Sequence, residues 1–162
     1  MRILTLSELI FINSRVVDIP ELATGKRKVR DIDLLEAAEQ RPLASAFGAD
    51  AYPELPDKIA ALFHSLVRNH PFTDGNKRTA TVAALFMAEV NGQHLVWDET
   101  EALELIVGTV ETNTDVPELA AWFAAVMQPC DATPEPDVDR DTATIDRLIH
   151  EHRWLLHELA SR

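Results

Sequence analysis

The chain has 162 residues, a length that suits one domain with a substantial core. Its 27 acidic and 15 basic residues give a formal net charge of −12, which disfavours a protein that binds nucleic acid through a basic face. The single cysteine, Cys130, excludes an intramolecular disulfide framework and a cysteine-based zinc site. No apolar run reaches the roughly 18 residues of a membrane span, and Glu8 interrupts the stretch that a signal peptide would keep apolar. We therefore expect a cytoplasmic protein with no membrane partner.

Helical periodicity dominates the N-terminal part of the chain. A capping-box pattern from Thr5 to Glu8 predicts a helix over residues 5–17, and a second, shorter helix is expected over 31–40. The basic run at 26–30, between these helices, is too small for a nucleic-acid face and is interpreted as a solvated loop. Residues 41–56 contain three prolines and one glycine, which predict a loop. Loops of this length often have a function.

Two strongly apolar helices are predicted next. Pro56 suits the first turn of a helix whose apolar residues recur at helical spacing: Ile59, Leu62, Phe63, Leu66 and Val67. A polar loop over 70–75 leads to a helix over 76–90 that is apolar on nearly every side, so we expect it at the centre of the domain. Two further helices are expected after Asp98 and after Asp115.

The composition changes after about residue 128. Residues 129–141 contain three prolines and five acidic residues, which is typical of a linker. Residues 142–162 are predicted as a C-terminal amphipathic helix with Ile145, Leu148, Ile149, Leu156 and Leu159 along one side. The predicted organisation is thus a domain over 1–128, a linker over 129–141 and an appended helix. The apolar stripe is expected to pack on its own bundle, on a second copy in a homodimer, or in a groove that a partner's helix would otherwise fill.

The residues that point to chemistry begin at a helix start. Gly75 is followed by Asn76, Lys77 and Arg78 in the first turn of the predicted helix over 76–90. A helix N-terminus favours anions, and acidic residues there stabilise a helix by about 0.3–1 kcal/mol, so two cations have the wrong sign. A bound phosphate would compensate them. Gly75 permits a positive φ and a close approach of the backbone to a ligand.

Asp74 and His70 supply the remaining chemistry of this stretch. A carboxylate beside a phosphate site suits Mg²⁺, which takes one or two carboxylates together with phosphate oxygens. His70 is a candidate general base. Each residue alone has an ordinary explanation, because histidines cap helices and Asp-Gly-Asn forms turns. Their concentration within residues 70–78 favours a functional anion site.

The order of these residues resembles a family signature. The run His-Pro-Phe-x-Asp-Gly-Asn-Lys-Arg at 70–78 resembles the Fic/Doc (Fido) signature His-x-Phe-x-(Asp/Glu)-(Gly/Ala)-Asn-(Gly/Lys)-Arg. The resemblance extends from the N-terminal helix to about Met127. It does not cover the C-terminal helix. The helical pattern predicts an all-α fold with that helix appended, and the resemblance implies a Fido-type helical bundle with a short β-hairpin-like flap between about residues 41 and 53.

The resemblance also implies roles for individual residues. His70 would be the base that deprotonates a target hydroxyl, and Asp74 would bind Mg²⁺. Residues 75–78 would hold the phosphates of ATP. Phe72 would be a buried aromatic that anchors the loop, and the flap would dock an extended segment of a protein substrate.

Two positions favour one branch of the family. Lys77 replaces a glycine and Thr81 replaces a second arginine of the members that transfer AMP. Both replacements resemble the Doc branch, whose toxins transfer the γ-phosphoryl group to a translation elongation factor and are restrained by a cognate antitoxin. A Fic-type AMP-transferase is the alternative enzyme, and a non-catalytic antitoxin-binding protein is the alternative of another class. The self-inhibitory pattern of many members, Ser/Thr-x-x-x-Glu-(Gly/Asn), has no complete match.

Overall fold

The computed structural model describes residues 1–17 and 29–162. Within these ranges helices dominate, and strands form only two small antiparallel pairs, so the all-α prediction is confirmed. Residues 26–28 of the basic run lie outside the described residues. None of the helices in the described part of the chain is long and apolar enough to span a membrane.

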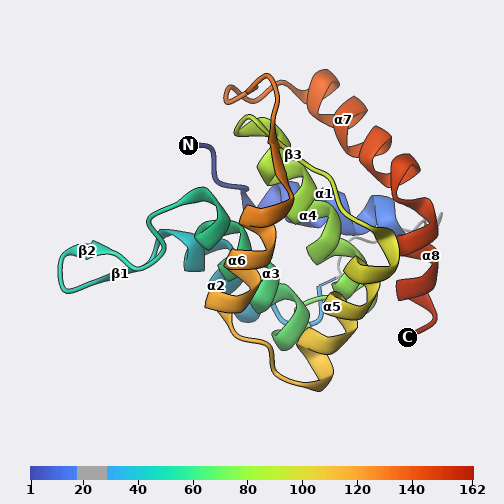
Figure 1. Cartoon of the computed structure of the whole chain (residues 1–162), viewed down its shortest axis with the longest axis horizontal. Coiled ribbons are helices and arrows are strands. Elements are labelled where there is room, and N and C mark those ends of the chain that lie inside the picture. The colour runs from blue at the N-terminus through green and yellow to red at the C-terminus, as the bar shows by residue number, and fades with distance from the viewer. Residues whose placement is uncertain (18–28) are drawn as a thin grey trace.

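The elements follow the predicted order closely (Figure 1). The helices are α1 (Leu6–Val17), α2 (Ile32–Gln40), α3 (Leu55–Asn69), α4 (Asn76–Val90), α5 (Glu99–Glu111), α6 (Val116–Val126), α7 (Val138–Glu151) and α8 (Arg153–Ala160). The strands are β1 (Ser45–Ala46), β2 (Ala49–Asp50), β3 (Gln93–Leu95) and β4 (Met127–Pro129). Strand β1 pairs with β2, and β3 pairs with β4.

Local capping signals explain where several helices begin. Thr5 and Glu8 form the predicted capping box before α1, with reciprocal hydrogen bonds of 2.9 and 3.2 Å between side chain and backbone. Asp98 and Asp115 each accept a hydrogen bond from a main-chain N–H three residues further on and so begin α5 and α6.

Helix α4 lies at the centre of the bundle, as predicted (Figure 1). It packs against α1, α3, α7 and α8, and most of its residues are buried. Helix α4 is apolar on nearly every side because it has packing neighbours on every side. The N-terminus of α4 is held rigidly by this packing, and it is there that the candidate site lies.

The predicted flap is present as the β1–β2 hairpin. Figure 1 shows it projecting away from the bundle. Its two turn residues, Phe47 and Gly48, have positive φ values of 53° and 81°, as a tight hairpin turn requires. The Phe47 ring is fully exposed at the tip.

The C-terminal segment differs from the prediction in its boundaries. One helix over 142–162 was predicted, whereas the structure has α7 and α8, and α7 begins at Val138, inside the predicted linker. Asp137 accepts a hydrogen bond from the main-chain N–H of Arg140 and caps α7. Asp139 and Asp141 lie in the first turn, where negative charge is favourable. Part of the acidic run within residues 129–141 therefore forms the N-terminus of α7 and does not act as a linker.

The bend between α7 and α8 occurs at His152. Its ring is 8% exposed, contacts Trp97 edge-on, and places Nδ1 3.0 Å from Glu99 Oε1. Upstream, the main-chain N–H groups of Cys130 and Thr133 donate to carbonyls at the end of α4. The segment between β4 and α7 thus lies against the bundle.

The apolar stripe of the C-terminal segment packs on the bundle of its own chain. Ile145, Leu148, Leu156 and Leu159 are all buried there. Helix α7 contacts α4 and α1, while α8 contacts α5 and α4. This is the first of the three predicted locations, and it is also compatible with the third, in which the segment fills a groove that a partner's helix would otherwise occupy.

Candidate functional site

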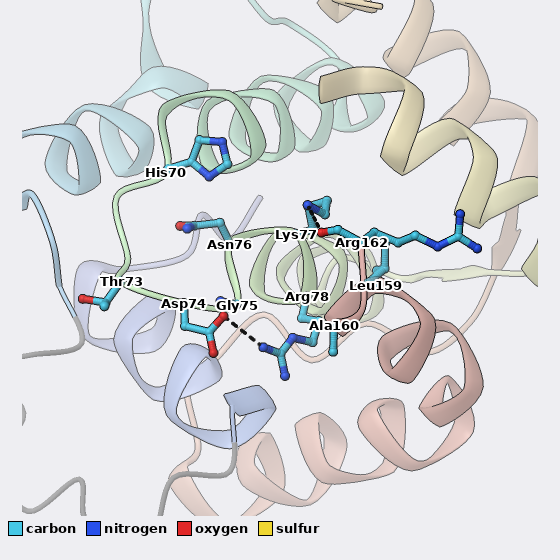
Figure 2. Close-up of a pocket in the computed structure, with 10 residues that line it drawn as sticks. All are labelled: His70, Thr73, Asp74, Gly75, Asn76, Lys77, Arg78, Leu159, Ala160 and Arg162. Carbon is cyan, nitrogen blue, oxygen red and sulfur yellow. Dashed lines mark hydrogen bonds and ion pairs between the residues drawn. The ribbon is translucent and has the colours of Figure 1, made fainter. Parts of the chain in front are cut away.

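All six predicted site residues line one pocket of about 200 Å³ (Figure 2). They are His70, Asp74, Gly75, Asn76, Lys77 and Arg78. The pocket lies at the N-terminus of α4, between the end of α3 and the end of α8. Its remaining wall is formed by Thr73 and by Leu159, Ala160 and Arg162.

His70 is the C-cap of α3 and has a left-handed backbone conformation, with φ 49° and ψ 58°. This conformation is uncommon for a residue with a side chain. Partial desolvation of the imidazole and the nearby cations Lys77, Arg30 and Arg68 lower the pKa of His70 below its ordinary value, although the residue is exposed. The lowered pKa favours the neutral imidazole, which is able to accept a proton.

Gly75 opens the N-terminus of α4 toward the pocket. It is the N-cap residue with φ 76°, and it offers no side-chain acceptor to the first turn of the helix. A Cβ atom added there would lie 2.6 Å from Val17 Cγ1, so only glycine fits. The first turn contains no acidic residue, and its partial positive charge faces the pocket. This arrangement suits a phosphate group.

The amide of Asn76 holds the loop before α4. Its Oδ1 accepts a hydrogen bond of 2.9 Å from the Phe72 N–H, and its Nδ2 donates one of 3.0 Å to the Phe72 carbonyl oxygen. Phe72 is 1% exposed, which agrees with its predicted place as a buried anchor. Asn76 therefore lines the pocket while its side chain fixes the loop.

Asp74 and Arg78 face each other across the mouth of the pocket (Figure 2). Asp74 Oδ1 accepts a hydrogen bond of 2.8 Å from the Gly75 N–H and lies 3.4 Å from Arg78 Nη2. The Asp74 side chain is 67% exposed, so its carboxylate remains accessible to a ligand. The Arg78 guanidinium is more buried and also donates to the Val16 carbonyl oxygen at 3.0 Å.

The donor set at Asp74 fits Mg²⁺ bound together with a phosphate. The described residues contain no cluster of three or more His, Cys, Asp or Glu side chains that could enclose a metal. A single exposed carboxylate beside an anion pocket is what Mg²⁺ uses when phosphate oxygens and water complete its six ligands. Asp74 would supply that carboxylate.

Two parts of the site were missed at the sequence level. The buried Asn13 of α1 donates hydrogen bonds of 2.9 Å to the Asp74 carbonyl oxygen and 3.1 Å to Thr79 Oγ1. These two bonds tie the loop and the first turn of α4 to α1. The end of α8 forms a wall of the pocket, where Lys77 Nζ donates to the Arg162 main-chain oxygen at 3.2 Å (Figure 2). An asparagine on the apolar face of α1 could have indicated that Asn13 supports the loop. Nothing in the sequence indicated that the end of α8 lines the pocket.

Comparison with known sequences identifies the family. The sequence model of the Fic/DOC family matches residues 3–88, a range that includes the whole of the 70–78 signature. The chain belongs to the Fic/DOC family. It is similar to the protein named Toxin Doc of Mycolicibacterium smegmatis (strain ATCC 700084 / mc(2)155), with 47% identity over 109 residues, which is 64% of this chain and 84% of that relative. Helices α7 and α8 lie beyond the residues that the family model matches.

Proposed function

We propose that this protein is a Doc-like toxin that transfers the γ-phosphoryl group of ATP to a Ser or Thr hydroxyl of a protein substrate, a translation elongation factor being the expected target. The observation that carries the proposal is a single pocket that combines a histidine of lowered pKa with a helix N-terminus and two cations. The similarity to the relative named Toxin Doc supports the toxin role. A cognate antitoxin would then restrain the protein.

In this reaction His70 takes the proton of the attacking hydroxyl. The hydroxyl oxygen forms a bond to the γ-phosphorus, the bond from that phosphorus to the β–γ bridging oxygen breaks, and ADP leaves. General-base catalysis of this kind contributes about 10²–10⁴-fold. Lys77, Arg78 and the N-terminus of α4 stabilise the negative charge of the phosphates. When bound at Asp74, Mg²⁺ supplies further charge neutralisation.

Two features favour phosphoryl transfer over AMP transfer. Thr81, which replaces the second arginine of AMP-transferring members, is fully buried and donates its hydroxyl to the Lys77 carbonyl oxygen at 2.8 Å. It offers no bidentate contact to a phosphate. Lys77 adds a point charge where those members have glycine. A nucleotide would therefore meet a different set of cations in this pocket.

The nature of the transferred group can be tested with labelled ATP. The protein, Mg²⁺ and a cell lysate are incubated with ATP labelled at the α or the γ position, beside His70→Ala and the control His150→Ala, which alters an exposed histidine outside the pocket. We expect label on protein from the γ position only, absent with His70→Ala and unchanged with His150→Ala. Label from the α position would identify an AMP-transferase. No label from either would favour the non-catalytic, antitoxin-binding alternative.

The pH dependence of transfer follows from the lowered pKa of His70. The reaction needs the neutral imidazole, so the rate falls as the pH drops through the pKa of His70. Because that pKa is lowered, the acidic limb should have its midpoint below the unperturbed histidine value of about 6.5. The initial rate of γ-label transfer measured between pH 5 and pH 8 checks this. A midpoint above 6.5 would contradict it.

A further inference from the structure

Arg30 binds the end of α3 at the point where His70 leaves the helix. Its Nε donates to the His70 carbonyl oxygen at 2.7 Å, and its Nη2 donates to the Asn69 carbonyl oxygen at 2.9 Å. The last carbonyls of a helix have no partner within the helix, and a cation is favourable there. One guanidinium thus satisfies two successive carbonyl groups, one of which belongs to His70.

The backbone around Arg30 reinforces this contact. The main-chain N–H groups of Arg30 and Asp31 donate to the Pro71 carbonyl oxygen at 2.8 and 3.1 Å. Val29 forms an isolated antiparallel bridge with Phe72. Residues 29–31 therefore run along the loop that carries His70, and this short strap positions the Arg30 side chain.

His70 needs such support because its backbone is strained. A left-handed conformation is unfavourable for a residue with a side chain, and it persists when the surroundings determine it. From these contacts we propose that Arg30 is a positioning residue: it fixes the left-handed backbone of His70 and so holds the imidazole toward the pocket. This inference rests on the proposed function of His70 as the base.

Besides fixing the backbone of His70 through hydrogen bonds, Arg30 affects the imidazole through its charge. Partial desolvation lowers the pKa of His70, and the charges of Lys77 from α4, Arg30 from the strap and Arg68 from α3 lower it further. Arg68 provides a matched control because its guanidinium donates to the Val110 carbonyl oxygen at 2.9 Å. It shares the charge effect but is bonded to the end of α5 instead of to His70.

The test compares Arg30→Gln, Arg30→Lys and Arg68→Gln in the full chain. One measurement is the backbone ¹³C and ¹⁵N chemical shifts of His70, which report its left-handed conformation. The other is the initial rate of γ-label transfer, with the dissociation constant of a non-hydrolysable ATP analogue measured alongside. For Arg30→Gln we expect His70 shifts that lose the left-handed pattern, a rate reduced on the order of 10- to 100-fold, and analogue affinity within about threefold of the natural chain.

Arg30→Lys keeps the charge and one donor, so it should recover part of the rate and of the His70 shifts. Arg68→Gln should leave the shifts unchanged and alter the rate little. Unchanged His70 shifts in a folded Arg30→Gln protein would overturn the inference, as would an equal loss of rate in Arg68→Gln. If the natural chain transfers no label, the proposed function fails while the chemical shifts still decide whether Arg30 fixes His70.

Discussion

Replacing Gly75 with alanine is expected to reduce γ-label transfer on the order of 100-fold and to lower the free energy of unfolding. The new Cβ would lie 2.6 Å from Val17 Cγ1 and 3.5 Å from both Asn13 Nδ2 and Arg78 Nη2. Relief of the clash requires the loop to move away from α1. Such a movement breaks the Asn13 contact with the Asp74 carbonyl oxygen and shifts the N-terminus of α4 relative to His70. A displacement of about 1 Å costs a reaction about 100-fold.

Gly48→Ala is the matched control for this substitution. Gly48 has a φ of 81°, close to the 76° of Gly75, but a Cβ there meets no described atom within 4 Å. Gly48→Ala therefore measures only the cost of a positive φ for alanine, which is about 1–2 kcal/mol. Chemical denaturation should show a larger loss of stability for Gly75→Ala than for Gly48→Ala. Equal losses in both variants would show that the contact with Val17 is unimportant.

The candidate site could be predicted because its chemistry is local in sequence. His70, Asp74 and residues 75–78 come from one loop and one helix turn, so their proximity needed no knowledge of the tertiary fold. The central position of α4 could be predicted for a related reason. A helix that is apolar on every side can be stable in water only when neighbours surround it.

The residues that support the site could not be predicted in the same way. Asn13 and Arg30 reach the 70–75 loop from other parts of the chain, and their contacts exist only once the bundle has formed. Nothing in the sequence indicated the left-handed backbone of His70 either, because a histidine at the end of a helix usually suggests an ordinary cap. Long-range packing, which periodicity does not specify, determined these features.

The start of α7 shows how one composition can have two physical meanings. Acidic residues between prolines are typical of a solvated linker, but the same residues stabilise a helix start when one of them caps it. Asp137 makes that hydrogen bond, and Asp141 also forms an ion pair of 2.7 Å with the nearly buried Arg2. The composition of residues 129–141 predicted a linker between 1–128 and 142–162, and a measurement of stability decides whether the C-terminal helices fold separately.

Leu148→Ala in α7 answers that question. Leu148 is fully buried between α7 and the bundle, so its truncation should lower the free energy of unfolding of the whole chain by about 2–5 kcal/mol. Val138→Ala, in the same helix but 82% exposed, should change it by no more than about 0.5 kcal/mol. Denaturation followed by tryptophan fluorescence suits the measurement, because Trp97 and Trp122 stack in the bundle while Trp154 is on α8.

A single transition that moves to lower denaturant for Leu148→Ala would show that α7 and α8 fold as part of the bundle. Two transitions, of which only one moves with Leu148→Ala, would show a separable C-terminal unit and would contradict the expectation. The result bears on the pocket as well, because Leu159 and Ala160 of α8 form one of its walls. If α8 folds as part of the bundle, its residues form as stable a wall of the pocket as the N-terminus of α4 does.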